Sequence, residues 1–172
     1  MSTVVTWQTD STSSEATEAL AVKLGQALRG GEVVELVSDL GGGKTTFVRG
    51  LVRGTGSVDH VASPTFTISR IYEAPARQTA GMIDPTHPPM PLEIHHFDFY
   101  RLHEPGIIAD ELAEVVHDSS SVAVVEWADV VQHVLPGKRL TVVIEQLPVG
   151  TRRLTFRCPE SLSYLIAALQ SH

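Results

Sequence analysis

The sequence is poor in several features, and each shortage excludes a class of protein. Its single cysteine, Cys158, allows no disulfide within the chain and suits a reducing compartment. It contains no asparagine, so it lacks the Asn-Lys-x-Asp motif on which guanine-selective switches depend. No stretch approaches the ~20 uninterrupted apolar residues of a membrane-spanning helix, and residues 1–10 lack the apolar run of a signal peptide. We therefore expect a cytoplasmic protein with no membrane contact.

Basic residues are also scarce. Lysine and arginine number 13 against 20 acidic residues, which gives a formal net charge of −7. Proteins that wrap nucleic acid regardless of its sequence rely on clustered Lys and Arg, so this class is disfavoured. A local RNA contact or a basic protein partner stays compatible with this charge.

The remaining composition is typical of a folded domain. The chain has 172 residues, of which 42% are hydrophobic and 19% charged, and a chain of this length buries about 70% of its unfolded surface. We predict a single domain over residues 1–172. Residues 74–91 differ from the rest, because they hold half of the chain's 10 prolines. Proline interrupts helices and central strands, so we predict a long loop there, without a catalytic role.

The most informative stretch is residues 33–46. Residues 33–37 are rich in valine and apolar except for Glu35, three glycines follow shortly after, and the next apolar residues repeat at helical spacing. A strand, a glycine turn and a helix in this order predict a phosphate-binding loop, because glycines let several N–H groups face one anion and the helix N-terminus adds partial positive charge. Lys44 would reach the phosphates, and Thr45 would offer its hydroxyl to Mg²⁺. The predicted nucleotide-binding residues are Ser38, Asp39, Leu40, Gly41, Gly42, Gly43, Lys44, Thr45 and Thr46.

Two of these residues leave alternatives open. Ser38 stands where the usual pattern begins with glycine, and its Cβ would crowd the loop if a positive φ were needed. Asp39 places a carboxylate among phosphates, so its side chain either faces solvent or has a function. The alternative interpretation of the whole stretch is an ordinary strand-to-helix turn, which the strand before the glycines and the helix after them disfavour.

Strands and helices alternate along the chain, and a hairpin follows near its end. The predicted strands are 3–7, 33–37, 65–72, 92–98, 122–125, 140–144 and 154–158, and the predicted helices are 12–28, 44–52, 108–116 and 162–169. The last two strands flank Pro148-Val149-Gly150 and predict an antiparallel hairpin. The fold class is therefore α/β: a three-layer, P-loop NTPase-like fold with a mixed sheet, which combines a parallel core with a C-terminal antiparallel hairpin.

Polar residues follow three of these strands. Ligands of such sheets bind beyond the carboxyl ends of the strands, where the phosphate loop, Asp98 and Glu126 would meet if the strands are parallel. Glu126 follows the more apolar strand, so we assign it, with Thr45, to magnesium. Asp98 would hold a metal-bound water or orient the attacking water. Thr65 occupies the place of a γ-phosphate sensor, although Ser63-Pro64-Thr65 also fits a turn.

Other reactive residue types have simpler interpretations. Arg101 could stabilise charge in a transition state, but an ordinary surface arginine is the favoured interpretation. His95 and His96 are neighbours on a predicted strand and point to opposite faces, so they do not form a metal-binding pair. Cys158 alternates with apolar residues and is predicted to lie in the core.

Four motifs in order carry a resemblance to a known family. They are Ser-Asp-Leu-Gly-Gly-Gly-Lys-Thr-Thr (38–46), Ser-Pro-Thr-Phe-Thr (63–67), His-Phe-Asp-Phe-Tyr-Arg-Leu (96–102) and Val-Glu-Trp (125–127). Together they resemble the TsaE (YjeE) family of bacterial ATPases. That family is required for threonylcarbamoyladenosine synthesis at position 37 of tRNAs that read codons beginning with A.

The resemblance implies a function and roles for single residues. The chain would bind ATP and Mg²⁺, hydrolyse ATP slowly alone, and reset the TsaB–TsaD assembly between turnovers. An indirect tRNA contact is compatible with this role, and a direct contact stays open. Lys44 and Thr45 would bind phosphate and magnesium, and Thr65 would act as a switch-like sensor. Asp98 and Glu126 would be the functional carboxylates. Trp127 would lie beside the nucleotide or the partner, unless it serves packing alone.

Two rival functions stay open. One is a small-molecule P-loop kinase, with Asp98 as base and Arg101 as phosphate clamp. Such kinases close an arginine-rich lid, whereas the sequence after Val116 holds no arginine cluster until Arg152-Arg153. The other is a non-catalytic partner module that uses nucleotide only for folding. The chain also departs from the pattern of the family in three places. Ser38 replaces the usual glycine, the proline-rich segment before His96 is longer than is typical, and the Glu-Leu pair that follows the Tyr-Arg motif comes late, at Glu111-Leu112.

Overall fold

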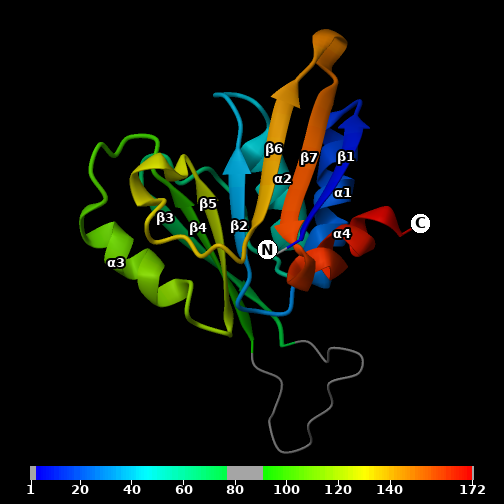
Figure 1. Cartoon of the computed structure of the whole chain (residues 1–172). Coiled ribbons are helices and arrows are strands. Elements are labelled where there is room, and N and C mark those ends of the chain that lie inside the picture. Colours follow the sequence, from blue (N-terminus) through cyan, green and yellow to red (C-terminus); the bar gives the residue numbers. More distant parts are fainter. Residues whose placement is uncertain (1–2, 77–90, 172) are drawn as a thin grey trace, which may run out of the picture.

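The computed structural model describes residues 3–76 and 91–171, so most of the predicted loop at 74–91 lies outside the described residues. Figure 1 shows the elements along the chain. The strands are β1 (Val4–Ser11), β2 (Val33–Val37), β3 (Ser69–Ala74), β4 (Leu92–Asp98), β5 (Ser121–Glu126), β6 (Leu140–Gln146) and β7 (Arg152–Pro159). The helices are α1 (Ser14–Ala27), α2 (Lys44–Gly54), α3 (Gly106–Val115) and α4 (Ser163–Gln170), with short 3-10 segments η1 (Ala128–Val131), η2 (Pro148–Gly150) and η3 (Glu160–Leu162).

Within the described residues, seven strands form one mixed sheet in the order β1-β7-β6-β2-β5-β4-β3 (Figure 1). β2 runs parallel to both β5 and β6, and β4 runs parallel to β5. β6 and β7 form the antiparallel hairpin. The predicted α/β fold class, with a parallel core and a C-terminal hairpin, is confirmed. The sequence did not predict that β1 would pair with β7, or that β3 would be antiparallel to β4.

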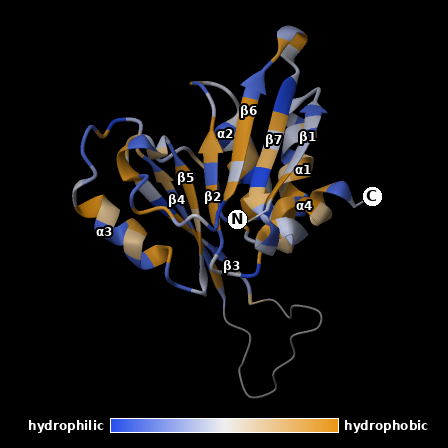
Figure 2. Cartoon of the chain, viewed as in Figure 1, coloured by the Kyte–Doolittle hydropathy of each residue, from blue (hydrophilic) through white to orange (hydrophobic). Residues whose placement is uncertain are grey.

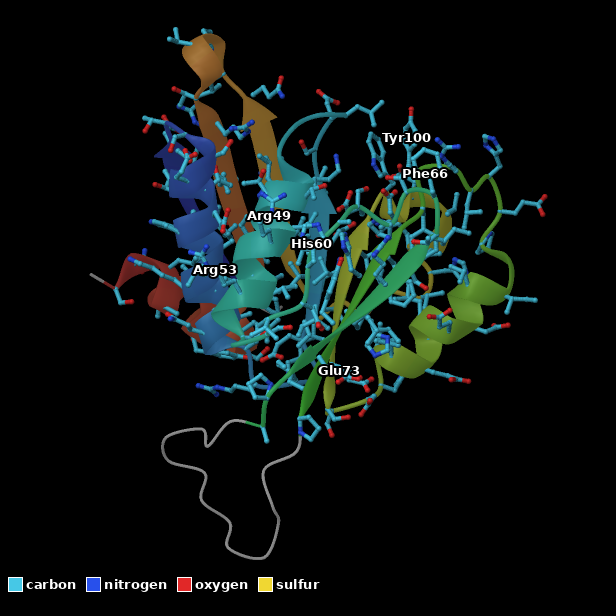
Figure 3. All side chains as sticks on the ribbon, turned by 180° about the vertical axis from the view of Figure 1, so that it is seen from behind. Arg49, Arg53, His60, Phe66, Glu73 and Tyr100 are labelled. Carbon is cyan, nitrogen blue, oxygen red and sulfur yellow. The ribbon has the colours of Figure 1, made fainter. Side chains whose placement is uncertain are left out.

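Helices cover both faces of the sheet and bury two apolar clusters. On one face, α1, α2 and α4 pack over the strands, and fully buried Phe47 and Phe156 lie in this cluster; Figure 3 shows α1 and α2 in front of the sheet. On the other face, α3 and η1 pack over the sheet, and Phe97 of β4 and Leu112 of α3 lie in this second cluster. Figure 2 shows the apolar residues of the central strands between these layers. Cys158 is buried in the first cluster, as predicted. Across the described residues, no helix combines the length and apolarity that crossing a membrane requires.

The strand predicted at 65–72 begins later than expected. The N–H groups of Thr67 and Ile68 donate to the Pro64 carbonyl at 2.9 and 2.6 Å, which forms a turn. Ile68 has φ +70, a conformation that β-branched residues rarely adopt. β3 therefore begins only at Ser69. The alternation of polar and apolar residues over 65–69 predicted a strand that begins at Thr65. The turn at residues 64–68 shows the same alternation, so the predicted start of the strand was wrong.

Hydrogen bonds join Gln132 and Arg139, which follow β5 in the chain, to buried Glu35 of the sheet. Glu35 in β2 is 6% exposed and accepts hydrogen bonds from Arg139 Nε at 2.8 Å, Gln132 Nε2 at 2.6 Å and the Thr141 hydroxyl at 3.1 Å. Burial alone would raise the pKa of Glu35, but Arg139, Gln132 and Thr141 together outweigh burial and lower it. The ionised carboxylate is thus the form that the fold favours.

We predict that Glu35 makes the stability of the fold sensitive to acid. Its folded pKa lies below the unfolded value of about 4.3, so its contribution is present above that pH and is lost as the pH falls through the folded pKa. Glu35→Gln should lower the free energy of unfolding at neutral pH by about 1–3 kcal/mol and flatten the acid dependence. Urea unfolding at several pH values measures both quantities. An unchanged acid slope in Glu35→Gln would contradict this role.

Candidate functional site

A cavity of about 260 Å³ lies where β2, β4 and β5 end. It brings together most of the residues that the sequence singled out. Those lining it are Leu40, Gly41, Gly42, Gly43, Lys44, Thr45, Thr46, Ser63, Thr65, Asp98, Glu126, Trp127 and Arg152. The expected meeting of the loop with both carboxylates at one edge of the sheet is therefore present, and Ser63 and Arg152 join it without having been predicted.

The glycine loop has the backbone conformation that an anion cradle needs. Gly41 and Gly43 have φ of 73 and 103, values that side chains with a Cβ avoid. Gly43 directly precedes α2, whose first N–H groups have no partner within the helix. A Cβ on Gly43 would lie 2.8 Å from Arg152 Nε, so the glycine also makes room for this arginine. Ser38 does not have a positive φ, so its Cβ causes no backbone strain in the loop.

The amine of Lys44 lies at the centre of this site and is largely withdrawn from water. Lys44 is 7% exposed, and its Nζ donates to the carbonyls of Ser38 at 3.2 Å and Asp39 at 2.9 Å. It lies 4.8 Å from the centroid of the Trp127 ring. Burial lowers the pKa of Lys44, and the negative charges of Glu126, Asp98 and Asp39 partly oppose this effect. The amine is thus held by the loop within the field of these carboxylates.

Ser38 and Asp39 do not line this cavity. They contribute backbone carbonyls to Lys44, and they line a neighbouring cavity of about 460 Å³ instead. Trp127 borders both cavities. The predicted phosphate loop therefore has two sides, and only the side formed by residues 40–46 faces the carboxylates.

Asp98 connects the end of β4 to the segment that carries Thr65. The register of β4 and β5 sets Asp98 opposite Glu126, and both residues are buried, at 3% and 2% exposed. Asp98 Oδ1 accepts from the Tyr100 N–H at 2.9 Å, and Oδ2 accepts from the Thr65 hydroxyl at 2.5 Å. The Ser63 hydroxyl lies 2.7 Å from that of Thr65. Two residues predicted for separate roles are thus joined by a hydrogen bond.

Glu126 has a partner that sequence reasoning missed. His96 Nε2 lies 2.7 Å from Glu126 Oε1, and His96 is fully buried. His95 contacts Glu93 instead, at 3.0 Å, so the two histidines have separate carboxylate partners and form no pair. His96 lies two residues before Asp98 on the same strand, and this spacing places both on one face of the sheet. The two-residue spacing between His96 and Asp98 was therefore the sequence signal that could have identified His96 as a residue near the site.

The rim of the cavity is aromatic. Trp127 has φ 54 and ψ 49, and its ring packs against Tyr100 with centroids 5.0 Å apart. The guanidinium of Arg101 lies 4.1 Å from the centre of the Phe66 ring, outside the residues that line the cavity. Phe66 is 82% exposed, and Figure 3 shows it with Tyr100 at this end of the sheet. Arg152 Nε donates to the Gly42 carbonyl at 3.1 Å, a contact that no local sequence pattern predicts.

These donors and acceptors fit a nucleotide phosphate group with a hard divalent cation. The glycine cradle and Lys44 supply positive groups for phosphate, and the Thr45 hydroxyl and the Glu126 carboxylate supply oxygen ligands. In the described part of the chain, no three His, Cys, Asp or Glu side chains gather as a ready-made metal site. Mg²⁺ does not require such a group, because it usually takes one or two protein ligands and completes its shell with phosphate and water.

Comparison with known proteins agrees with the motifs. The family model for "Threonylcarbamoyl adenosine biosynthesis protein TsaE" matches residues 11–154. The tRNA threonylcarbamoyladenosine biosynthesis protein TsaE of Bacillus subtilis (strain 168) is 34% identical over 150 residues, which cover 87% of this chain and 83% of that protein. The protein of the same description from Treponema pallidum is 31% identical over 145 residues, covering 84% and 96%. The crystal structure of Bacillus subtilis YdiB superposes with a TM-score of 0.69 at 29% identity, covering 98% of this chain and 95% of YdiB.

We predict that Gly43→Ala strains the loop. The left-handed conformation should cost about 1–2 kcal/mol, and the new methyl group should displace Arg152 from the Gly42 carbonyl. Urea unfolding measures the loss, with Gly137→Ala as control, because a Cβ at Gly137 meets open space and φ there is not positive. In an Arg152→Ala background the penalty should shrink to the conformational cost. Equal effects at positions 43 and 137 would disprove the strain.

Proposed function

The chain belongs to the TsaE family of threonylcarbamoyl adenosine biosynthesis proteins, and from that membership we propose that it is a magnesium-dependent ATPase that supports tRNA threonylcarbamoyladenosine formation. It would convert ATP to ADP and phosphate. The observation that carries this proposal is the cavity in which Lys44, Thr45, Asp98 and Glu126 adjoin one glycine loop.

The proposed binding step uses groups at the start of α2. The Lys44 amine would exchange its contacts with the Ser38 and Asp39 carbonyls for oxygens of the β- and γ-phosphates. The N–H groups that open α2 would donate to the same phosphates. Thr45 and Glu126 would hold Mg²⁺. When bound, this ion neutralises phosphate charge and stabilises the charge that develops during transfer.

The proposed hydrolytic step depends on Asp98 and Thr65. Asp98 would accept a hydrogen bond from the attacking water and orient it toward the γ-phosphate. In this structure its two oxygens already accept from the Tyr100 N–H and the Thr65 hydroxyl. Turning the Thr65 hydroxyl toward a γ-phosphate would free Asp98 Oδ2 for water. This competition offers a physical reason for a slow rate in the isolated chain.

We also propose that the chain acts on the TsaB–TsaD assembly in the cytoplasm, where ATP hydrolysis would reset the assembly between turnovers. An indirect contact with tRNA, through this assembly, is part of the same proposal. Exposed apolar side chains support a protein partner: Leu40, which lines the cavity, is 62% exposed, and Phe66, which follows the lining residue Thr65 in the chain, is 82% exposed. Large apolar side chains at such a rim are typical of binding surfaces. The kinase alternative has less support, since its suggested clamp, Arg101, packs on Phe66.

We predict that Lys44→Ala and Glu126→Ala each lower ATP turnover by about 10²-fold or more. Lys44→Ala removes a positive donor from the phosphates, and Glu126→Ala removes the carboxylate assigned to magnesium. Phosphate release measures turnover. The exposed Lys138 provides the matched control, Lys138→Ala, which should match wild type. The unfolding midpoint of Lys44→Ala should be unchanged or higher, because the variant no longer buries an ammonium. Turnover like wild type in either site variant would mean that the site is wrongly assigned.

We further predict that Lys44→Ala separates hydrolysis from assembly. In reconstituted tRNA modification with TsaB–TsaD, the wild-type chain should sustain many rounds, and Lys44→Ala should allow the first round only. Modified tRNA per assembly over time is the measurement. If Lys44→Ala sustains many rounds, nucleotide hydrolysis is dispensable and the chain is a non-catalytic module. Phosphorylation of a small metabolite by the wild-type chain would instead favour the kinase.

A further inference from the structure

Two adjacent histidines of β4 are buried, but only one of them contacts the site. His96 is 0% exposed and lies 2.7 Å from Glu126 through Nε2, and its ring packs near Tyr72 with centroids 6.3 Å apart. His95 is 8% exposed and contacts Glu93, whose side chain is 47% exposed. The Nδ1 atoms of both histidines are buried and have no hydrogen-bond partner among the described residues. His96 therefore makes one hydrogen bond, to Glu126, with its ring nitrogens.

This environment determines which nitrogen of His96 carries the proton. A neutral imidazole has one N–H donor and one acceptor nitrogen, and an ionised carboxylate only accepts. With the proton on Nε2, His96 donates to Glu126, and the unpaired Nδ1 is an acceptor. With the proton on Nδ1, a lone pair would face the carboxylate and a buried N–H would lack an acceptor, which is the more costly arrangement. The contact therefore requires the Nε2–H tautomer.

We infer that His96 is a positioning residue for Glu126. Because Oε1 is held by the imidazole, the carboxylate cannot rotate freely about its side-chain torsions. The other oxygen, Oε2, is then the one left for the cavity that Glu126 lines with Lys44 and Thr45. This inference rests on the proposed role of Glu126 toward magnesium. It adds that the carboxylate presents one oxygen, in an orientation set from inside the sheet.

The expected effect of losing this hydrogen bond is on magnesium more than on nucleotide. Residues that orient a metal ligand typically contribute about 10–100-fold to metal affinity or activity. Without His96, Glu126 keeps its charge but loses its fixed orientation. Binding of ADP in the absence of Mg²⁺ should therefore be unchanged, whereas the gain in ADP affinity on adding Mg²⁺ should fall by about 10–100-fold.

The experiment measures binding of a fluorescent ADP to His96→Leu, with and without Mg²⁺. His96→Gln should restore the Mg²⁺ effect in large part, because a glutamine amide can donate to Glu126 Oε1. His95→Leu is the matched control: it removes a buried histidine from the same strand, away from Glu126. Urea unfolding reports any damage to the fold, and His96→Gln keeps the test usable if His96→Leu folds poorly. A Mg²⁺ effect in both His96 variants equal to that in wild type would overturn the inference.

Nitrogen NMR of the ring tests the contact independently of nucleotide. We expect the ¹⁵N shifts of His96, assigned by their loss in His96→Gln, to show the Nε2–H tautomer. Glu126→Gln should shift these resonances, and Glu93→Gln should not. A His96 ring protonated only on Nδ1 would also overturn the inference. The two failures can be told apart: a wild-type chain without Mg²⁺-dependent nucleotide binding refutes the proposed function, whereas normal wild-type binding with an unaffected His96→Leu refutes only the role of His96.

Discussion

Removing an ammonium group from water is unfavourable unless other charges and acceptors replace the water. At Lys44 the replacement comes from separate parts of the chain: two carbonyls of its own loop, the face of Trp127, and the charges of Asp98 and Glu126. Burial still lowers the pKa of this lysine. These groups therefore do not fully replace the water that the Lys44 ammonium loses on burial, and phosphate oxygens would stabilise its positive charge further. The architecture of the sheet serves this arrangement, since parallel β2, β5 and β4 end at one edge.

Strand pairing positions the two carboxylates of the site, and different neighbouring residues hold each of them. Asp98 and Glu126 are cross-strand partners, so the sheet brings them together, but their surroundings differ. Asp98 is tied to a surface turn through Thr65, and that turn includes the unfavourable backbone of Ile68. Glu126 is tied to an imidazole inside the core. One carboxylate is thus coupled to a turn at the surface, and the other to a fully buried ring inside the sheet.

The sequence predicts the features that depend on local periodicity or on a short motif. The strand, glycine turn and helix around Lys44, the strand ending at Asp98, and the C-terminal hairpin all follow from such patterns. The features it does not predict depend on contacts distant along the chain. Arg152 reaches Gly42 because a hairpin folds back, and His96 reaches Glu126 because two strands share a register. The predicted start of the strand near Ile68 was wrong for another reason, since a turn and a strand can share the same alternation of polar and apolar residues.

The pairing of β1 with β7 has a consequence for the order of assembly during translation. Residues 4–11 are synthesised early, but their strand partner spans residues 152–159. At about 5–20 residues per second, the first strand waits on the order of ten seconds for its neighbour. The same late hairpin supplies Gln146 and Arg152, which hold the carbonyls of Gly41 and Gly42. A nascent chain therefore carries the glycine turn long before the side chains that brace it have left the ribosome.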